Sequence, residues 1–152
     1  MTASRALPSI PRSKRRVVAL AAVVVMVALA LSACSADEDG MFSMVNTSRS
    51  QASEGQLNPD IALIVKAQAW SKQLAADQSL HHSTLSDGAP AGWNRLGENV
   101  GTGGSLAIVN QAFLNSAPHR ANILDSSYTH LGVGVTVDAN GRYWIVEEFA
   151  AL

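Results

Sequence analysis

The sequence predicts one α+β domain in which helices precede a β-hairpin. Apolar residues recur at three- and four-residue steps from residue 61 to about residue 79, as in an amphipathic helix. Valine alternates with small or polar residues over 132–137, as in a half-buried strand. Asn140-Gly141 then gives the strongest short-range signal for a hairpin turn. Helices followed by a hairpin are typical of a layered α+β fold.

The first 33 residues are interpreted as an export signal. Basic residues at 12–16 precede an uncharged apolar run over 17–33. Leu31-Ser-Ala-Cys34 resembles the bacterial lipobox, in which the cysteine is lipidated and becomes the first mature residue. We expect a lipoprotein signal peptide over 1–33, a lipidated Cys34 with a flexible tether over 34–40, and a domain over 41–152. An uncleaved anchor helix ending at Cys34 is the alternative, and both place the domain outside the cytoplasm.

Charge and cysteine content argue against a nucleic-acid-binding protein and against a domain held together by internal disulfides. Five of the eleven basic residues and none of the twelve acidic residues lie in the first 33, so the remainder has a net charge of −6. An acidic domain lacks the clustered Lys and Arg that bind phosphates, and we expect no nucleic-acid partner. Cys34 is the only cysteine, so no disulfide can form within the chain.

Two helices are expected in the first half of the domain. The first covers residues 41–52, with Phe42 and Val45 on its inner face. Asn58-Pro59-Asp60 is a helix start, because Asn can cap, Pro fits the first turn and Asp suits the positive end. The helix that follows, from residue 61 to about residue 79, directs four residues to the core: Leu63, Ala67, Trp70 and Leu74.

The second half is expected to contain a long connection, a third helix and the hairpin. Residues 81–104 hold seven glycines and prolines and form an irregular connection, of a kind that often carries function. Ser105 caps a helix that extends to about Asn115, and residues 119–124 form one further helical turn. The inner face of the third helix is expected to consist of Ile108, Val109, Ala112 and Phe113. Residues 132–137 and 142–149 are the two hairpin strands.

Several short strings occur in a specific order along the domain. They are Leu80-His-His-Ser83, Leu96-Gly-Glu-Asn-Val100, Ser116-Ala-Pro-His-Arg-Ala-Asn-Ile-Leu124 and Leu131-Gly-Val-Gly-Val135. Together they resemble the bacterial branch of the CAP/SCP superfamily (cysteine-rich secretory protein, antigen 5, pathogenesis-related 1) over residues 41–152. The resemblance implies a CAP-type α–β–α sandwich with a small central antiparallel sheet. It also implies a further strand between residues 93 and 103.

The resemblance places a cleft on three residues of this chain. The family's cleft gathers two His and two Glu, and the matching positions here are His82, Glu98 and His119. The second Glu would fall near Ser116 and is missing. Such a set could hold Zn²⁺ or another divalent metal. Glu147 and Glu148 point to opposite faces of the last strand. We expect them at a solvated edge, and the alternative is that one of them approaches the cleft.

Three functions stay open at this point. The resemblance favours a binding module for an apolar or envelope-derived ligand, such as a lipid, a sterol-like molecule or a peptide. The incomplete set of carboxylates also favours binding over catalysis. The alternatives are a metal-assisted hydrolase, with Glu98 as general base on a water held by His82 and His119, and an envelope domain that binds another protein. We expect the protein outside the cytoplasm, attached by its lipid to the cell membrane or secreted.

Overall fold

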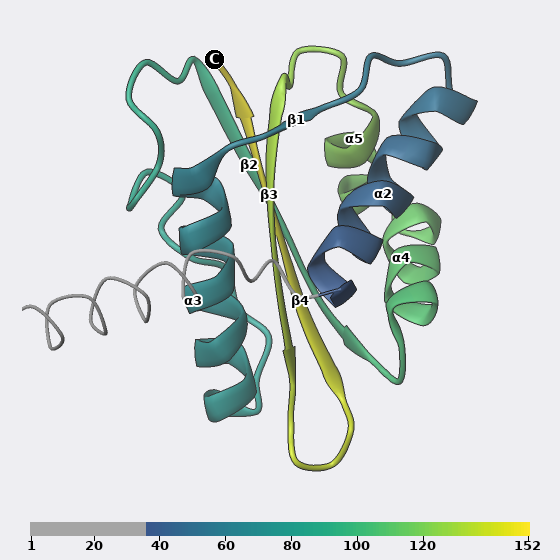
Figure 1. Ribbon diagram of the computed structural model, residues 1–152, viewed down its shortest axis with the longest axis vertical. Coiled ribbons are helices and arrows are strands. Elements are labelled where there is room, and N and C mark those ends of the chain that lie inside the picture. The colour runs from purple at the N-terminus through teal and green to yellow at the C-terminus, as the bar shows by residue number, and fades with distance from the viewer. Residues whose placement is uncertain (1–35) are drawn as a thin grey trace, which may run out of the picture. The chain divides into compact units, whose positions relative to one another are not determined.

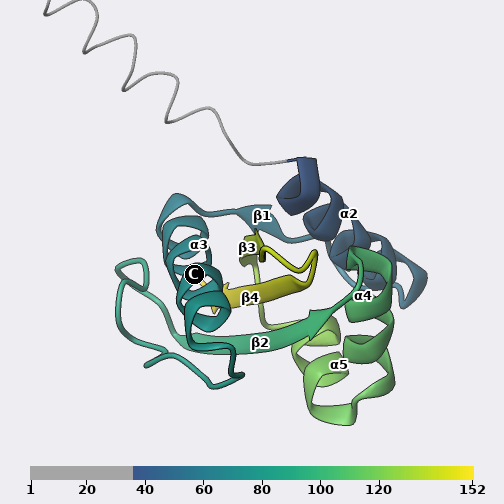
Figure 2. The same cartoon turned by 90° about the horizontal axis from the view of Figure 1, so that it is seen from below.

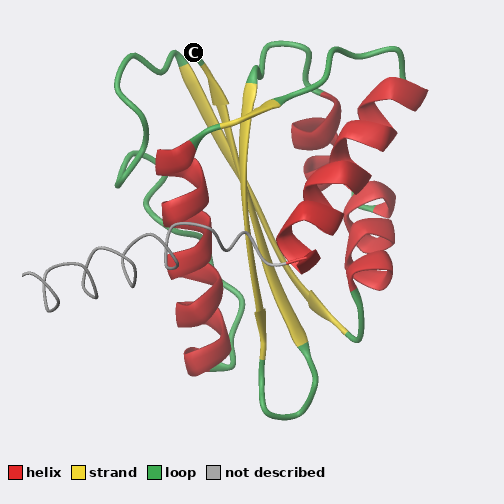
Figure 3. Cartoon of the chain, viewed as in Figure 1, coloured by secondary structure: helices red, strands yellow, loops and turns green. Residues whose placement is uncertain are grey.

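The protein's structure is a computed structural model that describes residues 36–152, so the predicted signal, the lipobox and Cys34 lie outside the described residues. Residues 36–152 belong to one compact unit. The elements are α2 (Ala36–Gln51), β1 (Asn58–Pro59), α3 (Ile61–Asp77), β2 (Arg95–Gly103), α4 (Leu106–Asn115), α5 (Ala117–Leu124), β3 (His130–Val137) and β4 (Tyr143–Ala151). The strands form a central layer with helices on both sides of it (Figures 1 and 3). This arrangement confirms the α+β prediction. Within residues 36–152, no helix is long and apolar enough to cross a membrane.

The four strands form one sheet in the order β1-β3-β4-β2. β4 is antiparallel to both β3 and β2, and the two-residue β1 is parallel to β3. Helix α3 covers one face of the sheet, and α2, α4 and α5 cover the other (Figures 1 and 2). This confirms the predicted α–β–α sandwich, and β2 is the strand that the family resemblance implied between residues 93 and 103.

Helix α3 packs directly on β3. It begins after Asp60, whose Oδ1 accepts a hydrogen bond from Leu63 N at 3.0 Å. Asn58 and Pro59, which were expected to help start this helix, form β1 instead. A Cβ atom at Gly132 would lie 2.1 Å from the backbone of Leu63, so only glycine lets the helix approach so closely. The alternation over 132–137 therefore places glycines against α3 and valines against the opposite layer.

The other layer contains the larger hydrophobic core. Ser105 caps α4 through a bond from Ile108 N to its Oγ, as predicted. Val109 and Phe113 are buried against the sheet, but Ile108 and Ala112 are exposed, which contradicts the predicted inner face. Only the two residues that face the sheet can be buried, because α4 lies in an outer layer and its sides contact water.

Helix α2 begins earlier than predicted. The prediction of a flexible tether over 34–40 is wrong from Ala36 onward, because the helix starts there. Glu38 is buried, and its carboxylate accepts bonds from Val135 N at 3.3 Å and Gln68 Nε2 at 3.1 Å. The first turn of α2 therefore covers part of the edge of β3 that the short β1 leaves open.

Candidate functional site

The structure brings two of the three predicted site residues into direct contact. His82 lies in the loop after α3, and Glu98 lies on β2. His82 Nδ1 and Glu98 Oε1 are 2.6 Å apart, and Ser83 N donates to the same oxygen at 3.0 Å. The Glu98 side chain is buried, whereas 61% of the His82 side chain is exposed. The two residues line a cleft of about 480 Å³, which we call the His82 cleft; it is also lined by Ser83, Leu85, Arg95, Leu96, Gly97, Asn122 and Tyr128.

His119 lies close to this pair but does not join it. Burial lowers the pKa of His119, and the charge of His82 lowers it further. The ring of His119 packs against Phe113, with ring centroids 5.0 Å apart. Among residues 36–152, no three His, Cys, Asp or Glu side chains are arranged to hold a metal ion. A divalent metal held by His82, Glu98 and His119 therefore stays a prediction.

A second carboxyl group lies beside Glu98. Glu148 on β4 is the cross-strand partner of Glu98, and it is buried. Its Oε1 lies 3.2 Å from the ammonium of Lys66 and 3.4 Å from Ser83 Oγ. Burial raises the pKa of Glu148 to about 8, and the neighbouring Glu98, to which it hydrogen-bonds, raises it as well. A second carboxyl group thus lies buried beside Glu98, although it does not line the cleft and the family position near Ser116 supplies none.

Glu147 points to the opposite face of β4 and is also buried. Asn99 Nδ2 donates to its Oε2 at 2.8 Å, and its Oε1 has no hydrogen-bond partner among the described residues. Burial raises the pKa of Glu147 to about 8. Asn99 Nδ2 also donates to the backbone oxygen of His119, and Asn122 Nδ2 donates to Asn99 Oδ1 at 2.9 Å. These bonds attach α5 to β2 and fix the backbone beside the His82 cleft.

The expectation that Glu147 and Glu148 lie at a solvated edge is wrong. β4 is paired on both sides, by β3 and by β2, and helices cover both of its faces. The periodicity of the sequence predicts only the two hairpin strands, and the second strand of an isolated hairpin has one unpaired edge. The strand that the resemblance implies between residues 93 and 103 is the signal that could have predicted the burial of both residues. If this strand pairs with the free edge of the hairpin, β4 becomes an internal strand of the sheet.

Ser116 and Arg120 lie at the start of α5. Ser116 occupies the N-cap position of α5 but makes no side-chain capping bond. Arg120 donates through Nη1 to the backbone oxygen of Leu114 at 2.8 Å. Both residues therefore shape the start of α5 through backbone contacts.

A larger groove lies on the outer side of α3, next to the His82 cleft. It has a volume of about 990 Å³ and lies between α3 and the loop of residues 81–88; we call it the α3 groove. Its lining residues are Ile61, Ala62, Val65, Lys66, Ala69, Trp70, Gln73, Asp77, His81, Ser83, Thr84, Asp87 and Gly88. Ser83 belongs to both hollows, so the loop is a wall that they share.

Three residues give this groove its apolar surface, and of these only Trp70 was assigned a position from the sequence. Ile61 and Val65 are 78% and 60% exposed, one helical turn apart on the outer face of α3. Trp70, predicted to be a core residue, is half-buried and lines the groove, with its Nε1 donating to the backbone oxygen of His81 at 3.1 Å. The periodicity showed the inner face of α3 but did not show that its outer face is also apolar.

Comparisons with known proteins agree with this fold. The protein is 29% identical over 122 residues to the uncharacterized protein YkwD of Bacillus subtilis, a match that covers 74% of this chain and 47% of YkwD. The chain thus spans about half the length of that curated relative. Among solved structures, an outer surface protein of Borrelia burgdorferi matches with a TM-score of 0.69 and 18% identity, over 75% of this chain and 91% of that one. An extracellular SCP-domain protein of Bacillus anthracis matches with a TM-score of 0.66 and 25% identity, over 76% of this chain and 40% of that one.

The family assignment comes from the sequence itself. The sequence profile of the CAP family matches residues 42–149. This range includes the cleft residues, the α3 groove and nearly all of the four strands. The chain therefore belongs to the cysteine-rich secretory protein (CAP) family.

Proposed function

We propose that the protein is an extracytoplasmic binding module that holds an apolar chain in the α3 groove. The observation that carries this proposal is the apolar outer face of α3. Ile61 and Val65 expose most of their side chains to water beside the half-buried Trp70. Contiguous exposed apolar surface on a small domain marks a place where a partner or ligand is bound, because its exposure costs free energy.

The size and shape of the groove favour a small ligand. Its volume of about 990 Å³ is at the upper end of the range for small-molecule sites, roughly 300–1,000 Å³. One wall is a rigid helix, and the other is held in place by Lys66, whose ammonium donates to the backbone oxygens of Thr84 and Leu85 at 3.2 and 2.7 Å. A preformed groove of this kind binds without a large cost of ordering.

A fluorescence experiment tests this proposal. Trp70 lines the groove, and a brominated alkyl alcohol bound there should quench its emission. We expect saturable quenching that is lost in Trp70→Phe and weakened at least tenfold in Val65→Gln, since a polar side chain at an apolar contact costs more than about 1.4 kcal/mol. Val137→Gln is the matched control, because Val137 is also exposed, at 45%, but does not line the groove. Equal binding by Val65→Gln and Val137→Gln would contradict the proposal.

The location outside the cytoplasm is part of the same proposal. The relatives described as an outer surface protein and an extracellular protein support it, as does the export signal that the sequence predicts. Cys34 is the proposed site of lipid attachment to the membrane. Metabolic labelling with an alkyne fatty acid should label the parent and Ser35→Ala but not Cys34→Ala. Labelling of Cys34→Ala at the level of the parent would contradict the lipid anchor.

One observation favours hydrolysis as a second function. The imidazole of His82 is held through Nδ1 by a buried carboxylate and exposes most of its surface, which is how a general base is oriented. In this version His82 is the base and Glu98 orients it, without a metal. Hydrolysis of a peptide or an ester by the parent protein that is lost in His82→Ala but retained in His81→Ala would support this second function. Activity that survives His82→Ala would exclude it.

A further inference from the structure

The exposed Asp, Glu, Lys and Arg side chains that line the α3 groove are all negatively charged. Asp77 and Asp87 line the groove, and both are exposed. Lys66 is the only Lys or Arg among the lining residues, and its side chain is 7% exposed. Its ammonium contacts the Glu148 carboxyl and two backbone oxygens, as described above. A ligand in the groove therefore meets carboxylates but no accessible ammonium or guanidinium from the lining.

The two ends of α3 reinforce this asymmetry. The first turn of a helix attracts anions, but here the carboxylate of Asp60 already accepts from Leu63 N. The last turn carries partial negative charge from its free carbonyl groups, and Asp77 is its final residue. Gln73 Nε2 orients the Asp77 carboxylate, with distances of 2.9 and 3.0 Å to its two oxygens. Both ends of the helix therefore disfavour an anionic head group.

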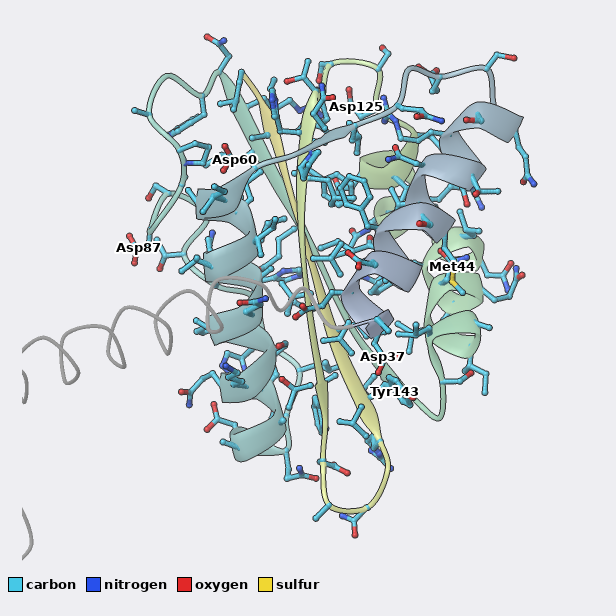
Figure 4. The ribbon with its side chains drawn as sticks, viewed as in Figure 1. Asp37, Met44, Asp60, Asp87, Asp125 and Tyr143 are labelled. Carbon is cyan, nitrogen blue, oxygen red and sulfur yellow. The ribbon has the colours of Figure 1, made fainter. Side chains whose placement is uncertain are left out.

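Asp87 adds a second carboxylate on the opposite wall. It lies in the loop of residues 81–88, and Figure 4 shows its side chain directed away from the sheet, on the same side as Asp60 and α3. Among residues 36–152 its side chain has no hydrogen bond or ion pair, whereas Asp77 also lies 3.6 Å from the ring of His81. A negative charge that faces an apolar groove without a partner favours a ligand that brings a positive one.

From this arrangement we infer that the ligand of the α3 groove is a single-chain amphiphile with a positively charged amine or quaternary ammonium head. The apolar chain lies along Ile61, Val65 and Trp70. The head lies at the C-terminal end of α3, beside Asp77. Helix α3 has 17 residues and is about 25 Å long, so an extended alkyl chain fits between its apolar start and this carboxylate. The inference rests on the proposed function, because it specifies the ligand of the same groove.

The test compares three amphiphiles of equal chain length: an alkyl trimethylammonium, an alkyl alcohol and an alkyl sulfate, each below its micelle concentration. The protein is residues 34–152, the compact unit that has its own hydrophobic cores. We expect the cation to bind roughly fivefold or more tightly than the alcohol, and the sulfate to bind more weakly than the alcohol. The advantage of the cation should shrink as salt is added, because the carboxylates are exposed.

Two substitutions assign the effect to the groove. Asp77→Asn should remove most of the cation's advantage, and the double variant with Asp87→Asn should remove all of it, with the affinity for the alcohol unchanged. Asp39→Asn, an exposed carboxylate outside the groove, is the matched control and should leave the ranking as it is. Circular dichroism of each variant verifies that the fold is retained.

The outcomes separate the inference from the proposed function. If the alcohol and the sulfate bind as tightly as the cation, the head-group inference fails while the apolar groove stands. If none of the three binds, the proposed function fails with it. If a basic amphipathic peptide displaces the quencher from Trp70 at lower concentration than the cationic amphiphile, the ligand is a protein segment and the inference is overturned.

Discussion

Replacing the carboxyl group of Glu147 by an amide tests whether β4 carries a protonated acid in the core. Burial raises the pKa of Glu147 from 4.5 to about 8. A carboxyl group with a raised pKa holds its proton more tightly in the folded chain than in the unfolded one. Its contribution to stability is complete below the unfolded pKa and is lost as the pH rises towards the folded pKa. At pH 7, between the two values, linkage gives a loss of about 3 kcal/mol relative to pH 4.

Glu147→Gln removes this titration and keeps an oxygen that can accept from Asn99. An amide group without a partner costs about 1–2 kcal/mol, so we expect the variant to be more stable than the parent at pH 7 by about 1–2 kcal/mol. At pH 4 the carboxyl group is protonated in both states of the parent, and the variant should lose its advantage. Glu148 still titrates in the variant, so the fall in stability between pH 5 and pH 8 should be about half that of the parent.

Urea unfolding at a series of pH values measures both effects. Asp87→Asn is the control, since this exposed side chain should change stability by less than about 0.5 kcal/mol. The reasoning is refuted if the stability of the parent is flat from pH 5 to pH 8. It is also refuted if Glu147→Gln is less stable than the parent at pH 7 while retaining its fold.

Three further substitutions test the packing around the site by urea unfolding. Gly134→Ala should destabilise by about 3 kcal/mol or more, because its Cβ would lie 2.1 Å from the Ala67 backbone oxygen, whereas Gly55→Ala, with open space, should have little effect. Arg49→Met should cost about 3 kcal/mol, since the buried guanidinium donates to three backbone oxygens that would lose their partner. Ser105→Ala should cost about 1 kcal/mol by removing the cap of α4, and an unchanged midpoint would contradict the capping role.

Local features of the fold could be predicted because local chemistry determines them. The Ser105 cap, the turn at Asn140-Gly141 and three of the four predicted inner residues of α3 (Leu63, Ala67 and Leu74) each depend on residues within a few positions of one another. β2 could not be found from periodicity, because Arg95–Gly103 contains three glycines and no clear alternation. It was expected only because the Gly-Glu-Asn string resembles that of the family.

The candidate site divides in the same way. The resemblance placed His82 and Glu98 in one cleft, and the structure pairs them at 2.6 Å. Glu148 could not be assigned, since its position beside Glu98 follows from the register between β2 and β4, which no local pattern encodes. The apolar outer face of α3 was missed for a related reason: a helix that is apolar on both sides gives a weak periodic signal.

The register of β2 and β4 also gives a physical reason for the buried acids. Glu98 accepts from Ser83 N and His82, and Glu148 holds Lys66, whose ammonium reaches the backbone oxygens of the same loop. The loop of residues 81–88 is thus attached at several points to the sheet and to α3. Because this loop is the second wall of the α3 groove, the carboxyl pair is best understood as the support that keeps the groove open. Burying two acids is costly in free energy. Under the proposed function, this cost is offset by a groove that is already formed before the ligand binds.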